Sequence, residues 1–248
     1  MRNIWTIARR EYRHYFTSPI AYIAGLLTTL TVGIIFVVNI YFMTGQSFYG
    51  NSAPGIDIVT SPMSFVFLFA APAVTMRLLA DEQRMGTLEL LLTTPIKGGE
   101  LVVGKWLGAF LFMLSIIALT LVFPIVLNYL ISPGIDQGVM LSAYIGLILL
   151  TSVFLAVGTA MSSFFSNQFA AFFATFAILL LLWFLIRIPT YIIQNPSINN
   201  VLNYLDLNGR FNSMVGGSIS ISDVIYPISL TALGLFLSTA AVEIRRWR

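Results

Sequence analysis

The chain has 248 residues, of which 58% are hydrophobic and only 9% are charged, and its net charge is +3. A soluble domain carries about 25% charged residues, so this composition excludes a soluble globular protein and indicates a membrane protein. With no cysteine and a single histidine, the sequence excludes disulfides, thiolate chemistry and a zinc site built from this chain alone, and we expect no metal ligands in it.

The first 18 residues predict an amphipathic helix in the membrane interface. Its apolar side chains share an arc of about 120° on a helical wheel; they are Ile4, Trp5, Ala8, Tyr12, Tyr15 and Phe16. The adjoining arc carries Arg2, Arg9, Arg10 and Arg13. We expect Trp5 in the acyl boundary and Arg9, Arg10 and Arg13 on lipid headgroups. The helix is then either an anchor that fixes topology or an elbow that also touches a cytoplasmic partner.

Long apolar stretches predict six transmembrane helices. We place them at roughly 20–43, 60–80, 103–131, 139–162, 168–188 and 224–243. The fourth and fifth lie within the 50 residues from 137 to 186, which contain no charged side chain. A stretch of that length is about twice what one crossing needs, and it has one polar break, Ser162–Gln168. The fold class is therefore an all-α polytopic membrane protein.

The distribution of lysine and arginine predicts the orientation of these spans. Eleven of the thirteen would lie on one side and only Arg187 and Arg210 on the other. By the positive-inside rule, both termini and residues 81–102 are cytoplasmic, and residues 44–59, 132–138 and 189–223 face outward. The basic charge therefore belongs to membrane topology and not to nucleic-acid binding. We expect a multi-pass protein of the cytoplasmic (inner) membrane of a prokaryote.

Small residues and prolines within the spans predict close helix contacts and kinks. Gly104-x-x-x-Gly108 is a close-contact pattern, used either within the chain or at a subunit interface. Pro72 and Pro124 are expected to kink their helices. No span has an acidic or basic side chain near its centre, which argues against an ion-coupled secondary transporter.

The cytoplasmic loop at 81–102 predicts a short amphipathic helix. One face carries Met85, Leu88, Leu91 and Leu92, and Glu82 and Glu89 share another face two turns apart. Pro95 ends the helix. Such a helix either lies on the membrane surface or docks into a groove on a cytoplasmic protein.

A phosphate-loop spacing beside this loop fails as a nucleotide site. Residues 99–105 match G-x-x-x-x-G-K, but Trp106 follows where serine or threonine must hold Mg²⁺. We therefore expect this chain not to be an enzyme and its energy to come from a partner or from a gradient.

Asparagine-rich residues 189–223 predict one or two short amphipathic helices at the outer surface. Leu202, Leu205 and Phe211 are among the apolar side chains interleaved with the asparagines. This segment is either an interfacial packing element or part of a gate.

The loop residues resemble a known family signature. The pattern Glu82-x-x-x-Gly86-Thr87-Leu88-Glu89-Leu90-Leu91-Leu92-x-x-Pro95-Ile96 resembles that of ABC type-2 permeases, in the branch of the gliding-motility and nitrous-oxide-reductase-maturation permeases. Residues 11–22 and 210–247 are similar to the same branch. Pro227 and Gly216-Gly217 depart from the gliding-motility type.

The resemblance implies a permease that pairs with a second copy or a paralogue and binds cytoplasmic ABC ATPase subunits. This chain would hold no cofactor, because ATP and Mg would bind the ATPase. The coupling residues would be Glu82, Gly86, Thr87, Leu88, Glu89, Leu91, Leu92 and Pro95. The leucines would anchor the partner and the two glutamates would pair with its basic residues. Leu202, Leu205 and Phe211 would belong to an outer gate.

These expectations describe residues 1–248 as one transmembrane domain. It comprises an interfacial helix at 1–18, two spans at 20–80, the coupling loop at 81–102, three spans at 103–188, the outer segment at 189–223, and the last span with a basic tail at 224–248. The function predicted is the transmembrane permease subunit of an ABC transporter, most simply an exporter of an unidentified substrate. The alternative is a non-ABC membrane protein, either a secondary carrier or a structural anchor of a surface machine.

Overall fold

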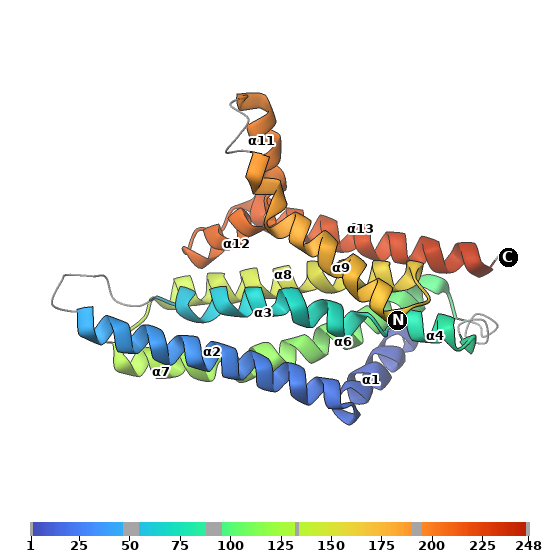
Figure 1. Ribbon diagram of the computed structural model, residues 1–248, viewed down its shortest axis with the longest axis horizontal. Coiled ribbons are helices and arrows are strands. Elements are labelled where there is room, and N and C mark those ends of the chain that lie inside the picture. The colour runs from blue at the N-terminus through green and yellow to red at the C-terminus, as the bar shows by residue number, and fades with distance from the viewer. Residues whose placement is uncertain (1, 47–54, 88–95, 132–133, 190–194, 247–248) are drawn as a thin grey trace.

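A computed structural model describes residues 2–46, 55–87, 96–131, 134–189 and 195–246. These residues form helices and turns and contain no strand, which confirms the all-α fold class. Both chain termini lie at one end of an elongated bundle, near the helices α1 (Arg2–Thr17) and α4 (Ala80–Arg84) (Figure 1). We call this the α1–α4 end.

Five helical stretches among the described residues are long and apolar enough to cross a membrane. They are Tyr22–Phe42, Asp57–Arg84, Gly98–Leu130, Gln137–Phe164 and Ile221–Arg245. The helices within them are α2 (Pro19–Gln46), α3 (Asp57–Thr75), α6 (Gly98–Thr120), α7 (Val122–Leu130), α8 (Gln137–Phe164) and α13 (Ile221–Arg246).

The expected crossing at 168–188 takes a shorter form. Helix α9 (Gln168–Trp183) has 16 residues and ends at Phe184, and a 3₁₀ turn follows at Leu185–Arg187. A helix of this length reaches about 24 Å, less than the apolar thickness of about 30 Å in a typical bilayer. A count of six spans therefore stays a prediction.

The expected break at Pro124 divides the third span into α6 and α7. Proline has no N–H to donate to the carbonyl four residues earlier, which here belongs to Thr120. The Tyr144 hydroxyl of α8 donates to that Thr120 carbonyl at 3.5 Å. A neighbouring helix thus satisfies the acceptor that the proline leaves open, as membrane helices require.

Helix α8 is the hub of the bundle, since it contacts α3, α6, α9, α12 (Leu207–Val215) and α13. Its glycines permit the closest approaches. A methyl group added at Gly158 would overlap the Thr75 side chain of α3, and one at Gly146 would lie 3.1 Å from Met214 Cβ of α12. At the contact with α13 the glycine belongs to the other helix, since Gly234 of α13 lies against the backbone of Ala156 of α8.

The Gly104-x-x-x-Gly108 pattern packs within the chain, against α1. A methyl group at Gly104 would lie 2.8 Å from Ile7 Cβ, and one at Gly108 would lie 2.6 Å from Glu11 Cβ. Helix α1 therefore crosses α6 at close range, with Ala8 fully buried. Of the two uses expected for the pattern, the structure shows packing within the chain.

The contact with α6 buries part of the apolar arc of α1 that was expected in the membrane interface. Tyr15 is buried, its ring stacks on Phe112 at 4.9 Å between centroids, and its hydroxyl donates to the Val74 carbonyl at 3.0 Å. Trp5, by contrast, is 57% exposed. The wheel identified an apolar face, but it could not show that protein would cover half of it.

We expect Gly108→Ala to destabilise the protein, because the added methyl must separate α1 from α6. Overpacking costs about 1–3 kcal/mol, which outweighs the gain of up to about 1 kcal/mol from replacing glycine in a helix. The matched control is Gly25→Ala, since a methyl there meets no atom within 4 Å. Thermal unfolding in detergent micelles measures the effect. Equal midpoints for the two variants would contradict it.

Candidate functional site

The first residues of the expected coupling loop form α4, a helix of five residues that ends sharply. Its C-cap is Met85, and Gly86 follows with a φ of 69°. That left-handed conformation suits glycine, and it ends a helix because it turns the chain away from the axis. One continuous helix carrying Glu82 and Glu89 on a common face is therefore wrong. Residues Leu88, Glu89, Leu91, Leu92 and Pro95 lie outside the described residues.

Helix α4 is bound tightly to the polar end of α8. The backbone N–H groups of Leu79 and Ala80 donate to the Ser162 hydroxyl at 3.0 and 3.1 Å. The Gln83 side chain donates to the Ser163 carbonyl at 2.8 Å. These bonds satisfy donors at the start of α4 and acceptors at the end of α8, which helix termini otherwise leave open.

The start of α9 holds the same helix from the other side. Gln168, the first residue of α9, donates a side-chain hydrogen bond to the Asp81 carboxylate of α4. Ser162 and Gln168 are the first and last residues of the polar break between the fourth and fifth predicted spans. Helix α4 therefore rests on this break, which we call the seat of α4. Hydrogen bonds from both α8 and α9 thus hold α4 in place.

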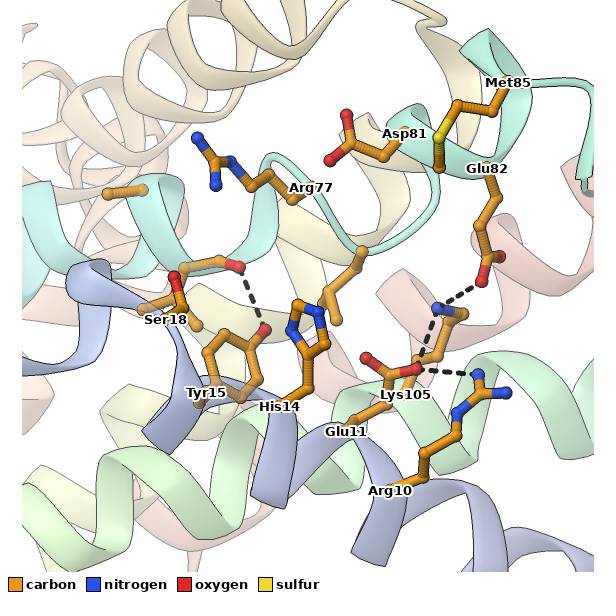
Figure 2. Close-up of a pocket in the computed structure, with 13 residues that line it drawn as sticks. Arg10, Glu11, His14, Tyr15, Ser18, Arg77, Asp81, Glu82, Met85 and Lys105 are labelled. Carbon is orange, nitrogen blue, oxygen red and sulfur yellow. Dashed lines mark hydrogen bonds and ion pairs between the residues drawn. The ribbon is translucent and has the colours of Figure 1, made fainter.

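A buried lysine joins α4 to α1. The Lys105 side chain is 3% exposed, and its Nζ lies 2.8 Å from Glu82 Oε1 and 3.2 Å from Glu11 Oε1. Arg10 adds a contact of 2.9 Å to the same Glu11 oxygen. Figure 2 shows these side chains converging from α1, α4 and α6. We call Glu11, Glu82 and Lys105 the ionic cluster.

The charges in this cluster compensate one another. Burial alone would raise the pKa of Glu11, but Lys105 and Arg10 outweigh it and hold that pKa below its ordinary value. Glu11 therefore contributes stability above its ordinary pKa, and this contribution is lost as the pH falls through the lowered value. An isolated buried ammonium is costly, and the two carboxylates supply the counter-charges beside Lys105.

The ionic cluster changes the role expected for Glu82. We predicted that it pairs with a basic residue of a partner, whereas the structure pairs it with Lys105 of this chain. Its second oxygen, Oε2, is buried without a hydrogen-bond partner among the described residues. Thr87 bonds back to the Glu82 carbonyl at 3.3 Å. Glu82 thus links the ionic cluster to the C-terminal end of α4.

The three arginines expected on lipid headgroups lie on the exposed surface of α1. Arg9, Arg10 and Arg13 are all exposed on α1. They lie on the side of α1 that α6 leaves uncovered. Whether they contact lipid stays a prediction.

The outer segment is organised around Arg210 of α12. Its guanidinium lies 3.1 Å from Asp223 Oδ1 and donates to the Tyr204 carbonyl at 2.8 and 3.0 Å. It also sits 4.6 and 4.8 Å from the ring centroids of Tyr204 and Tyr226. Arg210 therefore fastens α11 (Pro196–Leu205), α12 and α13 together.

The three residues expected at an outer gate do not form one surface. Phe211 is 3% exposed and packs on Trp183, with ring centroids 5.8 Å apart. Leu205 is exposed, and Leu202 is half-buried on α11, the helix that stands away from the bundle in Figure 1. Phe211 thus packs in the core, and a gating role for all three residues stays a prediction.

Sequence reasoning missed the residues that hold this site together. Lys105 counted only as a topological charge at the start of a span, although its position one turn from Gly108 on a close-contact face could have indicated burial. The sequence shows the polar break at Ser162–Gln168 as an interruption of an apolar stretch, but it does not predict that α4 contacts it. Within the described residues, no three histidine or carboxylate side chains come together to hold a metal ion.

We expect Lys105→Met to destabilise the protein by about 3 kcal/mol, because Glu11 and Glu82 would remain buried without a counter-charge. Adding Glu82→Gln to the variant should recover part of the loss by removing one of the two charges. The exposed Lys97→Met is the matched control. Thermal unfolding at neutral pH measures all three, and equal midpoints for Lys105→Met and Lys97→Met would refute the compensating role.

We expect Arg210→Lys to loosen α11, since lysine cannot keep the forked contacts to the Tyr204 carbonyl and Asp223 together. A loss of about 1.4 kcal/mol corresponds to roughly tenfold faster local opening. Hydrogen–deuterium exchange of residues 196–205 measures this opening. Arg9→Lys, an exposed exchange of the same kind on α1, should leave it unchanged; unchanged exchange in both variants would argue against an Arg210 fastening.

Comparison with known proteins agrees with this architecture. The chain matches the family described as ABC-2 family transporter protein over residues 5–243. It is also 26% identical over 258 residues to a Pseudomonas aeruginosa protein named as a probable ABC transporter permease protein, NosY, and the alignment covers 95% of this chain and 92% of that protein. The apolar helices and the family match support neither of the two alternatives considered above, a secondary carrier or a structural anchor. The chain therefore belongs to the ABC-2 transporter family and is a transmembrane permease subunit of an ABC transporter.

Proposed function

We propose that the α1–α4 end of this permease is cytoplasmic and receives an ABC ATPase subunit, which drives transport by hydrolysing Mg-bound ATP. The observation that carries this proposal is the attachment of α4. Ser162 and Gln168 tie it to α8 and α9, and Lys105 ties it to α6 and α1. A push on the loop that contains α4 would reach four helices through contacts of about 3 Å.

The charge distribution supports this orientation. Arg9, Arg10 and Arg13 of α1 and Arg84 of α4 are exposed at the same end of the bundle. Positive side chains at the ends of spans favour the cytoplasmic side. With α9 as the fifth of six crossings, both termini would lie on that side, and we propose that the membrane is the inner membrane of a prokaryote.

In this mechanism the chain forms half of the pathway and a second permease copy or a paralogue forms the other half. ATP binding would move α4, and the helices seated on it would follow as a unit because the ionic cluster resists their separation. The pathway would then open alternately to each side. Export of an unidentified substrate is the direction that we propose, since the family resemblance favours it.

The absence of cysteine from the sequence makes the docking test simple, because single cysteines can be introduced without removing native ones. Met85→Cys places a thiol on a side chain that is 67% exposed at the end of α4. Tyr129→Cys, where the native side chain is 85% exposed at the end of α7, is the control.

We expect Met85→Cys to react with a membrane-impermeant maleimide in inside-out vesicles and to cross-link to the co-expressed ATPase. Tyr129→Cys should react only from the opposite face and form no such cross-link. Labelling of Met85→Cys from outside the cell would overturn the orientation. An active complex in which Met85→Cys forms no cross-link to the ATPase would overturn the docking role.

A further inference from the structure

A cavity of about 310 Å³ opens at the α1–α4 end, between α1, α3, α4 and α6. Its volume falls within the range of small-ligand pockets, about 300–1,000 Å³. The polar part of its lining includes His14, Arg77, Asp81 and Glu82. Figure 2 shows His14 between Arg77 on one side and the ionic cluster on the other.

The cavity holds polar side chains whose hydrogen-bonding capacity the described residues leave unused. Neither the Arg77 guanidinium nor the His14 imidazole makes a hydrogen bond or ion pair with the residues that the structure describes. On the facing wall, the half-buried Asp81 accepts a hydrogen bond from Gln168 at Oδ1, and its second oxygen makes no bond with the described residues. The cavity thus offers a cationic donor and an anionic acceptor at the same time, which suits a zwitterionic ligand.

The rest of the lining places the cavity at the depth of lipid headgroups. Ser18 lies at the junction where α1 ends and the spanning helix α2 begins. Tyr15, Val74 and Leu78 give the cavity an apolar wall. A polar mouth beside an apolar wall, at the point where a helix enters the bilayer, matches the boundary between headgroups and acyl chains.

We propose that this cavity binds the phosphoethanolamine headgroup of a phosphatidylethanolamine molecule from the inner leaflet. Arg77, assisted by His14, binds the phosphate, because a guanidinium forms forked, charge-assisted hydrogen bonds to phosphate oxygens. The Asp81 carboxylate accepts a hydrogen bond from the ammonium group. The apolar wall contacts the glycerol and the first methylene groups.

This pairing predicts the headgroup selectivity. Phosphatidylcholine carries the same charges, but its quaternary ammonium has no N–H to donate to the carboxylate. Phosphatidylglycerol keeps the phosphate and lacks the cation. Both lipids should therefore occupy the cavity less than phosphatidylethanolamine does. The site rests on the orientation proposed above, but lipid retention is measured on the permease without its ATPase, so the two proposals fail separately.

The test uses the full chain, exchanged in mild detergent into vesicles that contain equal amounts of the three phospholipids. Native mass spectrometry then counts the lipids that remain bound after extraction. We expect preferential retention of phosphatidylethanolamine and an about tenfold loss of it in Arg77→Gln, the equivalent of one charge-assisted hydrogen bond. Arg13→Gln, an exposed change on α1 outside the cavity, should retain the lipid as the unmodified chain does.

A second variant and a soluble competitor sharpen the result. His14→Gln should lower retention in the same direction as Arg77→Gln, and soluble O-phosphoethanolamine should fail to displace the lipid at matched concentration. Three results would each overturn the proposal: equal retention of the three lipids, displacement by the soluble headgroup, or an Arg77→Gln variant that loses its ATPase while its lipid retention is unchanged.

Discussion

The buried ammonium of Lys105 is the interaction on which the arrangement of the α1–α4 end depends. It lies between the carboxylates of Glu11 and Glu82, which belong to two helices that make no other ion pair with α6 among the described residues. A charge in this environment is stable only when it is compensated, so the lysine fixes where α1 and α4 must lie. The contact of α1 with Gly104 and Gly108 then brings Glu11 within reach of it.

The rest of the bundle transmits what happens at this end through close packing and hydroxyl contacts. Without a hydrophobic drive between helices in lipid, small residues and interhelical hydrogen bonds provide the cohesion. Gly158 lets α3 approach α8, and Ser152 of α8 bonds to Thr231 of α13 at 3.0 Å. Helix α8 thus connects the seat of α4 to the helices that reach the outer segment.

The two ends of the molecule use charge differently. At the α1–α4 end, the ionic cluster adjoins a cavity lined by Arg77 and His14, whose side chains have no partner among the described residues. At the other end, Arg210 is enclosed by Asp223, the Tyr204 carbonyl and two aromatic rings. The first arrangement suits an end that exchanges partners, and the second suits one that holds three short elements in a fixed relation.

The sequence alone determined the membrane class, the helical fold and the approximate positions of five spans, because apolar length and the scarcity of charge are local properties of the sequence that suit a segment to the bilayer. It also determined the family, through the residues around Glu82 and Gly86. Only the tertiary structure decided the partners: Gly108 with Glu11, Ser162 with Leu79, and Lys105 with Glu82. These pairs are separated by between 23 and 97 residues along the chain, and no periodicity specifies which of several polar side chains at helix ends will meet. The sequence did not predict the helix end at Gly86 for a related reason. The periodicity of Met85 and the leucines fits one helix, and the left-handed conformation of Gly86 that ends α4 is visible only in the folded chain.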